Sequence, residues 1–212
     1  MTPRIKMLIV DDHPIFRKGI KLVLADAYDL EIAGEASSGH EALDLLRKNK
    51  YDVVTLDLSM EGLDGLATLK QMRYEGIQTP VIILSIHPEE QYAIRTLKAG
   101  ASGYLSKTSV PDELVLAIRR VAGGGKYVTA AIAERIISHI QGDVGNSLPH
   151  ERLSDREFQI LGLLAAGKTV SEIGVELNIS VKTVSTHRMH ILEKMGMETN
   201  AQLMRYALDQ QL

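Results

Sequence analysis

Four short apolar runs in the first half of the chain end beside residues whose side chains suit metal chemistry. Asp11 and Asp12 follow the first run, and Asp57 follows the second. Ser85 follows the third run, and Lys107 lies two residues after the fourth. A single aspartate after a strand is commonly a turn former or a helix N-cap. Three carboxylates that converge need a cation, and hard oxygen ligands in a chain without cysteine favour Mg²⁺ over Zn²⁺.

The apolar runs themselves indicate how these residues come together. Runs of this length, at 7–10, 53–56, 81–84 and 104–105, are typical of strands that are buried on both faces. Leu30–Ala36 alternates more strongly, which predicts an edge strand. Helix-period segments lie between the runs, so we expect an α/β fold with five strands in a doubly wound, flavodoxin-like parallel sheet. The carboxyl ends of its strands would share one edge, where open α/β folds bind ligands.

The ordered motifs "VDD", "LDLSMEGLDGL", "ILS" and "GYLSK" resemble the receiver domain of two-component response regulators, over residues 4–123. The resemblance implies that Asp57 accepts a phosphoryl group from a sensor histidine kinase. It also implies that Asp11, Asp12 and Asp57 hold Mg²⁺, and we expect the backbone carbonyl of Ser59 to complete the set of protein ligands.

The same resemblance assigns roles to residues around the acceptor. The counterpart of Lys107 pairs with the phosphoryl oxygens and offsets charge repulsion during transfer. Those of Ser85 and Tyr104 form a switch, in which the hydroxyl moves toward the phosphoryl group and the aromatic ring turns inward. Ser59 and His87 are expected to line the rim of the site and to tune the lifetime of the phosphoryl group.

Two receiver positions depart from the family pattern. Glu61 and Thr108 stand where the family often has proline. If the peptide bond before Thr108 were cis, it would cost about 3–4 kcal/mol without proline. We interpret neither departure as a loss of function.

Composition limits the classes of protein that the chain can represent. Its 212 residues are 45% hydrophobic and 24% charged, as in globular proteins. The absence of cysteine excludes disulfides, thiolate metal sites and cysteine nucleophiles, and it fits a cytoplasmic location. No apolar run approaches the roughly 18 residues of a membrane helix, so we expect no membrane partner. Residues 127–212 carry eight basic and ten acidic side chains, so a prediction of DNA binding must rest on local pattern.

Residues 124–152 are expected to form a linker that contains a short helix. "AGGGKYV" ends the last receiver helix, and isoleucines at 132, 136, 137 and 140 then predict an amphipathic helix. The stretch "QGDVGNSLPHER" has two glycines, a proline and almost no apolar period, which is typical of a linker.

Residues 153–212 are expected to form a separate all-α domain. Ser154 and Glu157 have the spacing of a capping box, and Ser180 follows a tight turn as the N-cap of a helix over 181–195. A last helix starts at about Thr199. Two short helices joined by the three-residue turn "NIS" predict a helix-turn-helix. The opposite faces of the 181–195 helix are apolar and polar, and from geometry alone the polar face fits a solvated surface as well as a DNA contact.

The stretch "LSDREFQILGLLAAGKTVSEIGVELNISVKTVSTHRMHILEKMG" resembles the LuxR-type helix-turn-helix, within residues 149–212. Gly174 departs from the usual alanine, which should weaken its helix by up to about 1 kcal/mol. The resemblance implies that the last helix makes a dimer contact through Gln202, Arg205 and Tyr206. It implies that the residues that face DNA or lie beside it are Lys182, Thr183, Ser185, Thr186, His187, Arg188, Met189, His190 and Lys194.

The two domains together resemble a response regulator of the NarL/FixJ type over almost the whole chain. This implies a DNA-binding transcriptional regulator rather than an enzyme, in which phosphorylation of Asp57 promotes dimerisation and binding to double-stranded promoter DNA. One alternative is a phosphatase or phosphotransferase that forms an aspartyl-phosphate; Ser59, where haloacid-dehalogenase phosphatases have a second aspartate, argues against it. The other alternative is an adaptor that only docks partners. Sequence-selective retention on DNA would separate the first reading from both.

Overall fold

The computed structural model describes residues 4–86, 89–108, 111–140 and 148–210. The chain divides into two compact units, Met1–Ile136 and Ile137–Leu212, and each is described by itself. Among the described residues, no helix has the length and apolar character needed to cross a membrane.

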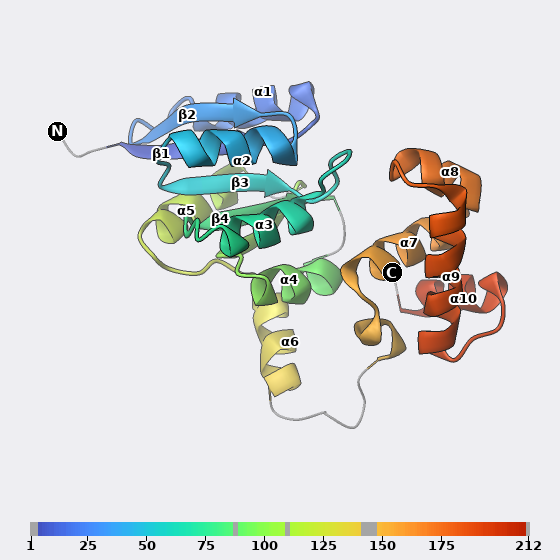
Figure 1. The fold of residues 1–212 in the computed structure, drawn as a ribbon. Helices are drawn as coiled ribbons and strands as arrows, with labels where there is room; N and C mark the ends of the chain where they lie inside the picture. Colours follow the sequence, from blue (N-terminus) through green and yellow to red (C-terminus); the bar gives the residue numbers. More distant parts are fainter. Residues whose placement is uncertain (1–3, 87–88, 109–110, 141–147, 211–212) are drawn as a thin grey trace. The chain divides into compact units, whose positions relative to one another are not determined.

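The first unit contains a parallel sheet in the order β2-β1-β3-β4-β5 (Figure 1). The strands are β1 (Ile5–Val10), β2 (Leu30–Ala36), β3 (Val53–Asp57), β4 (Val81–Ser85) and β5 (Gly103–Ser106). The helices that follow them are α1 (Pro14–Leu24), α2 (Gly39–Lys48), α3 (Gly65–Tyr74), α4 (Glu89–Lys98) and α5 (Pro111–Ala122). This is the predicted flavodoxin-like order, with β2 at an edge of the sheet.

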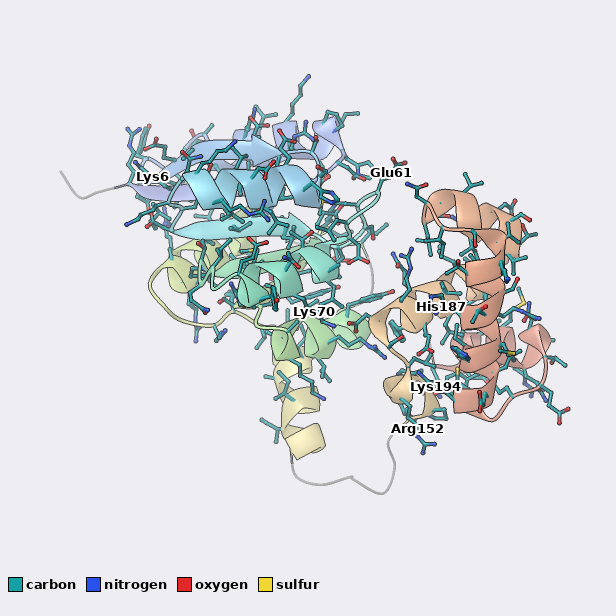
Figure 2. The ribbon with its side chains drawn as sticks, in the orientation of Figure 1. Lys6, Glu61, Lys70, Arg152, His187 and Lys194 are labelled. Carbon is teal, nitrogen blue, oxygen red and sulfur yellow. The ribbon has the colours of Figure 1, made fainter. Side chains whose placement is uncertain are left out.

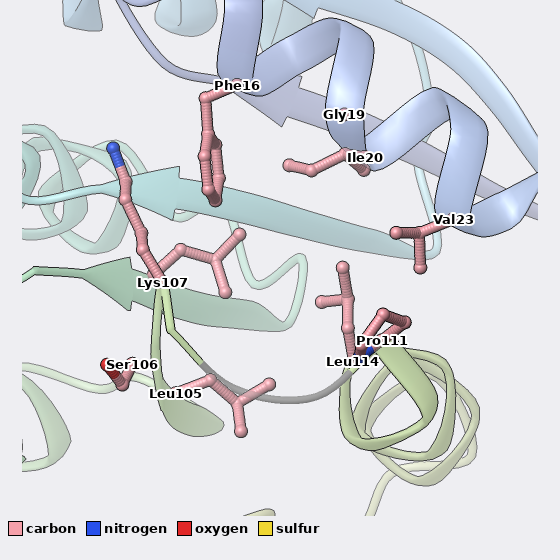
Figure 3. A pocket seen from close by; sticks show the side chains of 10 residues that line it. Phe16, Gly19, Ile20, Val23, Leu105, Ser106, Lys107, Pro111 and Leu114 are labelled. Atoms are coloured by element: carbon pink, nitrogen blue, oxygen red, sulfur yellow. The ribbon is translucent and has the colours of Figure 1, made fainter.

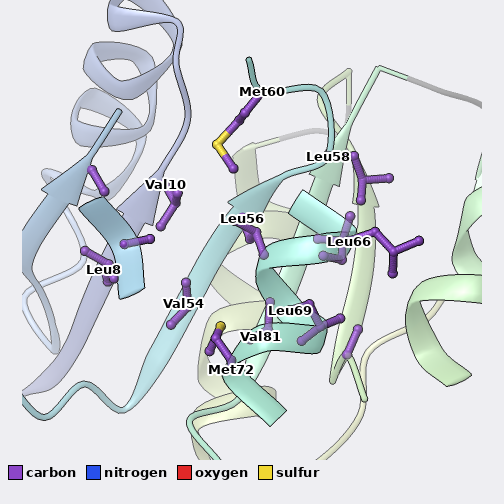
Figure 4. Packing of buried hydrophobic residues seen from close by; sticks show 14 of the residues in the cluster. Leu8, Val10, Val54, Leu56, Leu58, Met60, Leu66, Leu69, Met72 and Val81 are labelled. Carbon is purple, nitrogen blue, oxygen red and sulfur yellow. The ribbon is translucent and has the colours of Figure 1, made fainter. Parts of the chain in front are cut away.

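Two apolar clusters cover the two faces of the sheet. Alternate residues of β1 explain why its run is continuously apolar: Leu8 and Val10 belong to one cluster, and Met7 and Ile9 belong to the other. The first cluster contains residues of α2, α3 and α4, and part of it is drawn in Figure 4. The second contains residues of α1 and α5. Burial of each such side chain contributes about 1.5–3 kcal/mol, which fixes the strands in register and aligns their carboxyl ends.

Helix α6 (Ala130–Ile140) lies in the segment expected to be a linker. Ile132 is fully buried in the first receiver cluster, and Ile136 packs against this cluster. Ile137, which was assigned to the same apolar face, is 51% exposed, and the side chain of Ile140 lies outside the described residues. The first turns of α6 therefore belong to the receiver core.

The second unit consists of helices held by local caps. They are η1 (Pro149–Arg152, a 3₁₀ turn), α7 (Asp155–Ala165), α8 (Val170–Glu176), α9 (Val181–Met195) and α10 (Asn200–Asp209). The Ser154–Glu157 capping box and the Ser180 N-cap are both present, as predicted. Val184, Ile191 and Met195 form the buried face of α9, which also confirms the helical-period prediction.

The turn between α8 and α9 is tight. Asn178 takes a left-handed conformation with φ of 50°, and the Ile179 N–H donates to the carbonyl of Gly174. A Cβ on Gly174 would lie 3.0 Å from the carbonyl oxygen of Ile179. The close approach of the turn thus offsets part of the helix-propensity cost that we expected for this glycine.

Candidate functional site

A buried ion cluster lies at the carboxyl ends of β1, β3 and β5. The Lys107 Nζ lies 2.7 Å from Asp11 Oδ2 and 2.7 Å from Asp57 Oδ2. Both aspartates are almost completely buried, at 2% and 1% exposure. Asp57 is the last residue of β3, whereas Asp11 and Lys107 directly follow their strands. The parallel sheet therefore converts three distant sequence positions into one charged site.

Backbone groups fix the orientation of these carboxylates. The Ser59 N–H donates to Asp57 Oδ1 at 3.2 Å, and the His13 N–H donates to Asp11 Oδ1 at 2.8 Å. Immediately below the acceptor, a Cβ on Gly65 would lie 2.0 Å from the carbonyl oxygen of Asp57. Only glycine leaves room for α3 to begin so close to the end of β3.

The acidic groups form a set that fits a divalent cation. Oxygen atoms of Asp11, Asp12 and Asp57 and a ring nitrogen of His13 all lie within 4.8 Å of one another. Asp12 is only partly buried, and its Oδ2 accepts from the Glu61 N–H at 3.3 Å. Carboxylate oxygens are the donors that Mg²⁺ prefers, so the residues present match the predicted ion in chemistry.

His13 was not identified from the sequence, although it directly follows the two aspartates. Its Nδ1 lies 2.6 Å from Asp12 Oδ1 and 3.5 Å from Asp11 Oδ1. The side chain is 68% exposed and sits at the N-cap of α1. The motif "DDHP" contained this signal, because a histidine that directly follows two successive aspartates is close enough in sequence to reach both carboxylates.

Burial has the largest effect on the pKa of the Asp57 carboxyl. Burial raises the pKa of the Asp57 carboxyl, the ammonium of Lys107 lowers it in part, and the charge of Asp11 adds to the rise. The net direction is a raised pKa, so the site holds a carboxylate at neutral pH against a desolvation cost.

Lys107 also borders an apolar cavity of about 250 Å³ between α1 and α5 (Figure 3). Its ammonium lies 4.5 Å from the ring centroid of Phe16, which adds a cation–π contact to the two ion pairs. Figure 3 shows Phe16 and Ile20 on α1 and Leu114 on α5 bordering this cavity. The residues that border the cavity are mostly apolar.

The two predicted switch residues are both buried. Ser85 ends β4, and its carbonyl accepts from the Lys107 N–H at 2.7 Å. Tyr104 lies on β5, and its side chain is fully buried in the first apolar cluster. The peptide bond between Lys107 and Thr108 is trans, as are the other described peptide bonds. His87 lies outside the described residues.

Helix α9 presents a polar surface. The side chains at 182, 183, 185, 186, 189, 190 and 194 are exposed, whereas His187 and Arg188 are half-buried. Ser185 Oγ donates to the carbonyl of Val181 at 2.9 Å, and Thr186 Oγ1 donates to that of Lys182 at 3.0 Å. Both hydroxyl groups thus donate their protons within the helix, and the lone pairs of their oxygen atoms remain as acceptors on its outer face.

Several predicted DNA-contact residues are held by the domain itself. Lys194 Nζ contacts both carboxylate oxygens of the buried Glu157, at 2.7 and 2.9 Å, and Figure 2 labels this lysine on α9. Arg188 donates to Asn200 Oδ1 at 2.8 Å. His187 has a buried Nδ1 with no described hydrogen-bond partner, and burial lowers its pKa. These residues support α9 as well as bordering its polar surface.

The three predicted dimer residues differ in their surroundings. Gln202 closes the capping box of α10 with Thr199. The Tyr206 hydroxyl lies 2.8 Å from His150 Nδ1 within the same unit. Arg205 is exposed. Two of the three therefore already have a structural role inside the domain.

Comparison with known proteins identifies both units. Residues 7–119 match the response regulator receiver domain, and residues 151–207 match the bacterial regulatory proteins of the luxR family. The chain is 37% identical over 205 residues to the response regulator UvrY of Escherichia coli strain K12, covering 96% of this chain and 94% of UvrY. This chain is a response regulator of the NarL/FixJ type. The predicted family and fold are confirmed.

Further relatives support the same assignment. The response regulator is 38% identical to the transcriptional regulatory protein LiaR of Bacillus subtilis strain 168, with 96% of each chain covered. It is also similar, at 27% identity and a TM-score of 0.67, to RcsB from Salmonella enterica serovar Typhimurium bound to promoter P1flhDC in the presence of phosphomimetic BeF₃⁻. That match covers 96% of this chain and 98% of RcsB. The response regulator is thus a transcriptional regulator with a LuxR-type DNA-binding domain, and its relatives are regulators rather than enzymes.

Proposed function

We propose that Asp57 accepts a phosphoryl group from a sensor histidine kinase. The observation that carries this proposal is the buried Lys107 ammonium, 2.7 Å from both Asp11 and Asp57. In the transfer, the phosphorus–nitrogen bond of the kinase phosphohistidine breaks and a bond from an Asp57 carboxylate oxygen to phosphorus forms. Lys107 already lies where the charge of the transferred group arises, so little reorganisation is needed during the reaction.

We assign the divalent cation to the acidic cluster. Asp11, Asp12, Asp57 and the backbone carbonyl of Ser59 would hold Mg²⁺, which supplies positive charge that offsets repulsion between acceptor and phosphoryl oxygens. Residue 59 is a serine, so no second carboxylate follows Asp57 at the position a phosphatase of the haloacid-dehalogenase type would use. A chain of this kind stores the phosphoryl group, and its effect is read elsewhere in the molecule.

We further propose that the polar surface of α9 reads promoter DNA in the bacterial cytoplasm. A helix of this polarity fits the major groove, where each good base contact discriminates by about 1–3 kcal/mol. The outward lone pairs of Ser185 and Thr186 suit base donors, and Lys182 is exposed at the start of the helix, where a phosphate contact is expected.

The acceptor assignment is tested by mass. Incubation with acetyl phosphate and Mg²⁺ should add one phosphoryl group to the wild-type chain, none to Asp57→Asn and very little to Asp12→Ala. Asp26→Asn is the matched control, because Asp26 is exposed on the loop after α1. Intact-mass spectra with equal labelling of Asp57→Asn and Asp26→Asn would refute Asp57 as the acceptor.

A further inference from the structure

The chain that follows α5 returns to cover the outer edge of the receiver sheet. The Tyr127 N–H donates to the carbonyl of Ser102 at 3.0 Å, and the Tyr104 N–H donates to the carbonyl of Tyr127 at 3.1 Å. Tyr127 and Gly103 form a parallel bridge. Tyr127 therefore pairs with the edge of β5 as a single-residue strand, and its carbonyl accepts a hydrogen bond from the backbone N–H of the switch residue Tyr104.

This edge contact is close and has further support. A Cβ on Gly103 would lie 3.0 Å from the carbonyl oxygen of Tyr127, so a side chain at 103 would push the two segments apart. Lys126 Nζ donates to the carbonyl of Ala101 at 2.9 Å. The segment that leads into α6 is thus attached to β5 by backbone and side-chain bonds.

A side chain from the first turns of α6 is buried in the same apolar cluster as the switch residue Tyr104. Ile132 is 1% exposed, and it belongs to the apolar cluster that contains Tyr104, Ala93 of α4 and Ala101. Ile136 is partly buried against the same cluster, whereas Ile137 on the other side of the helix is 51% exposed. Close-packed interiors respond to displaced groups by discrete repacking, so a change in the position of the Tyr104 ring must be accommodated by its cluster.

We infer that Tyr127 and Ile132 are positioning residues of the switch, which make the start of α6 follow the position of Tyr104. This inference rests on the proposed phosphorylation of Asp57. It assigns α6 a role in signal output: the phosphoryl group acts on Ser85 and Tyr104, Tyr104 acts on Tyr127 and Ile132, and α6 passes the change to the chain that enters the DNA-binding unit.

Amide hydrogen exchange of the full chain tests the inference directly. With acetyl phosphate and Mg²⁺, exchange should change in β5 and also in peptides covering residues 126–136. Intact mass is recorded on the same samples, so a failure of Asp57 to take up phosphoryl is seen separately. Full phosphorylation with a response in β5 and unchanged exchange over 126–136 would overturn the inference while leaving the acceptor assignment in place.

Variants on the two sides of α6 separate coupling from general stability. Ile132→Ala should take up phosphoryl normally and retain the response of β5, but lose the response over 126–136. On a duplex selected from a random library by the wild-type chain, phosphorylation should raise wild-type affinity within the roughly 5- to 150-fold range of allosteric coupling, and Ile132→Ala should lose at least about two-thirds of that gain. Ile137→Ala should behave as wild type.

The conservative variant Ile132→Val keeps most of the buried volume and should restore the gain. If Ile132→Ala does not fold, Ile132→Val and the wild-type exchange pattern still decide the matter. A full phosphorylation gain in a folded Ile132→Ala, or equal losses in Ile132→Ala and Ile137→Ala, would show that burial of Ile132 does not couple the switch to α6.

Discussion

At Asp57, burial and three neighbouring groups act on one carboxyl. Burial raises its pKa, Lys107 and the Ser59 N–H oppose the rise, and the charge of Asp11 reinforces it. A carboxyl with a raised folded-state pKa binds its proton more tightly in the folded chain than in the unfolded chain. The stability that protonation provides is fully present below the unfolded value of about 3.8 and is lost as the pH rises through the folded pKa. The ionised acceptor therefore costs stability at neutral pH.

Asp57→Asn should accordingly be more stable than wild type at pH 7 without divalent metal, because the amide removes the charge while Lys107 keeps its ion pair with Asp11. The difference should shrink as the pH falls through the raised folded-state pKa of Asp57, where the wild-type carboxyl becomes protonated. Scanning calorimetry in EDTA over a pH series measures this in the receiver transition. Asp26→Asn should show no such trend, and a wild type more stable than Asp57→Asn at neutral pH would contradict the expectation.

At the scale of elements, one ion pair joins α7 to α9. Glu157 is 3% exposed and closes the α7 capping box with Ser154, while its carboxylate also receives Lys194 of α9. Burial raises the pKa of Glu157, but the hydrogen bonds from Lys194 and Ser154 outweigh burial and leave it lowered. The group therefore adds stability above its unfolded pKa, and this stability is lost as the pH falls through the folded value.

Lys194→Ala should destabilise the DNA-binding unit by about 1–3 kcal/mol at pH 7, toward the lower end because the half-exposed ammonium is screened by water. The loss should diminish as the pH falls through the lowered folded-state pKa of Glu157, where this carboxyl becomes protonated. Lys182→Ala, on the exposed start of the same helix, should leave stability within about 0.5 kcal/mol of wild type and weaken DNA binding uniformly. Urea unfolding and salt-dependent binding assays compare the two variants. Equal stability of both would show that the ion pair between Lys194 and Glu157 does not stabilise the DNA-binding unit.

At the scale of the whole molecule, charge limits how tightly one DNA-binding unit can bind. Residues 127–212 have a net charge of −2, and of the three lysines and arginines on α9, Lys194 and Arg188 are engaged within the domain. A unit that neutralises few phosphates binds weakly and with a shallow salt dependence. Two units on half-sites about 34 Å apart bind far more tightly, because binding of the second becomes intramolecular.

Phosphorylation should therefore act by forming dimers. The phosphorylated chain should be more dimeric in sedimentation and should bind a duplex with two half-sites more tightly than the unphosphorylated chain, with a much smaller gain on one half-site. The measurements are sedimentation velocity and gel-shift titration of both forms, with Asp57→Asn treated identically as control. Equal mass and equal affinity before and after phosphorylation would rule out a dimer-based switch.

A shift of the resting population from 1:99 to 99:1 needs about 5.5 kcal/mol, so dimer contacts must add to what the phosphoryl group supplies.

The sequence by itself determined the strands, the acidic set and the long helix. Continuous apolar runs can be buried only between two covered faces, so they specified a parallel sheet and placed Asp11, Asp57 and Lys107 at one edge. The period of α9 and the N-cap at Ser180 are local properties, and both were predicted from neighbouring residues. The ordered motifs added the family, which the comparisons confirmed.

Only the tertiary structure decided which charges and apolar residues meet across elements. Lys194 was predicted to lie near DNA, and the structure shows in addition that its ammonium pairs with a carboxylate 37 positions earlier, a contact that no local spacing encodes. The four isoleucines of α6 had equivalent sequence patterns, yet packing within the first apolar cluster buries Ile132, whereas Ile137 is exposed. The physical reason is the same in both cases: periodicity specifies the face of a helix, and only the packed fold specifies what that face contacts.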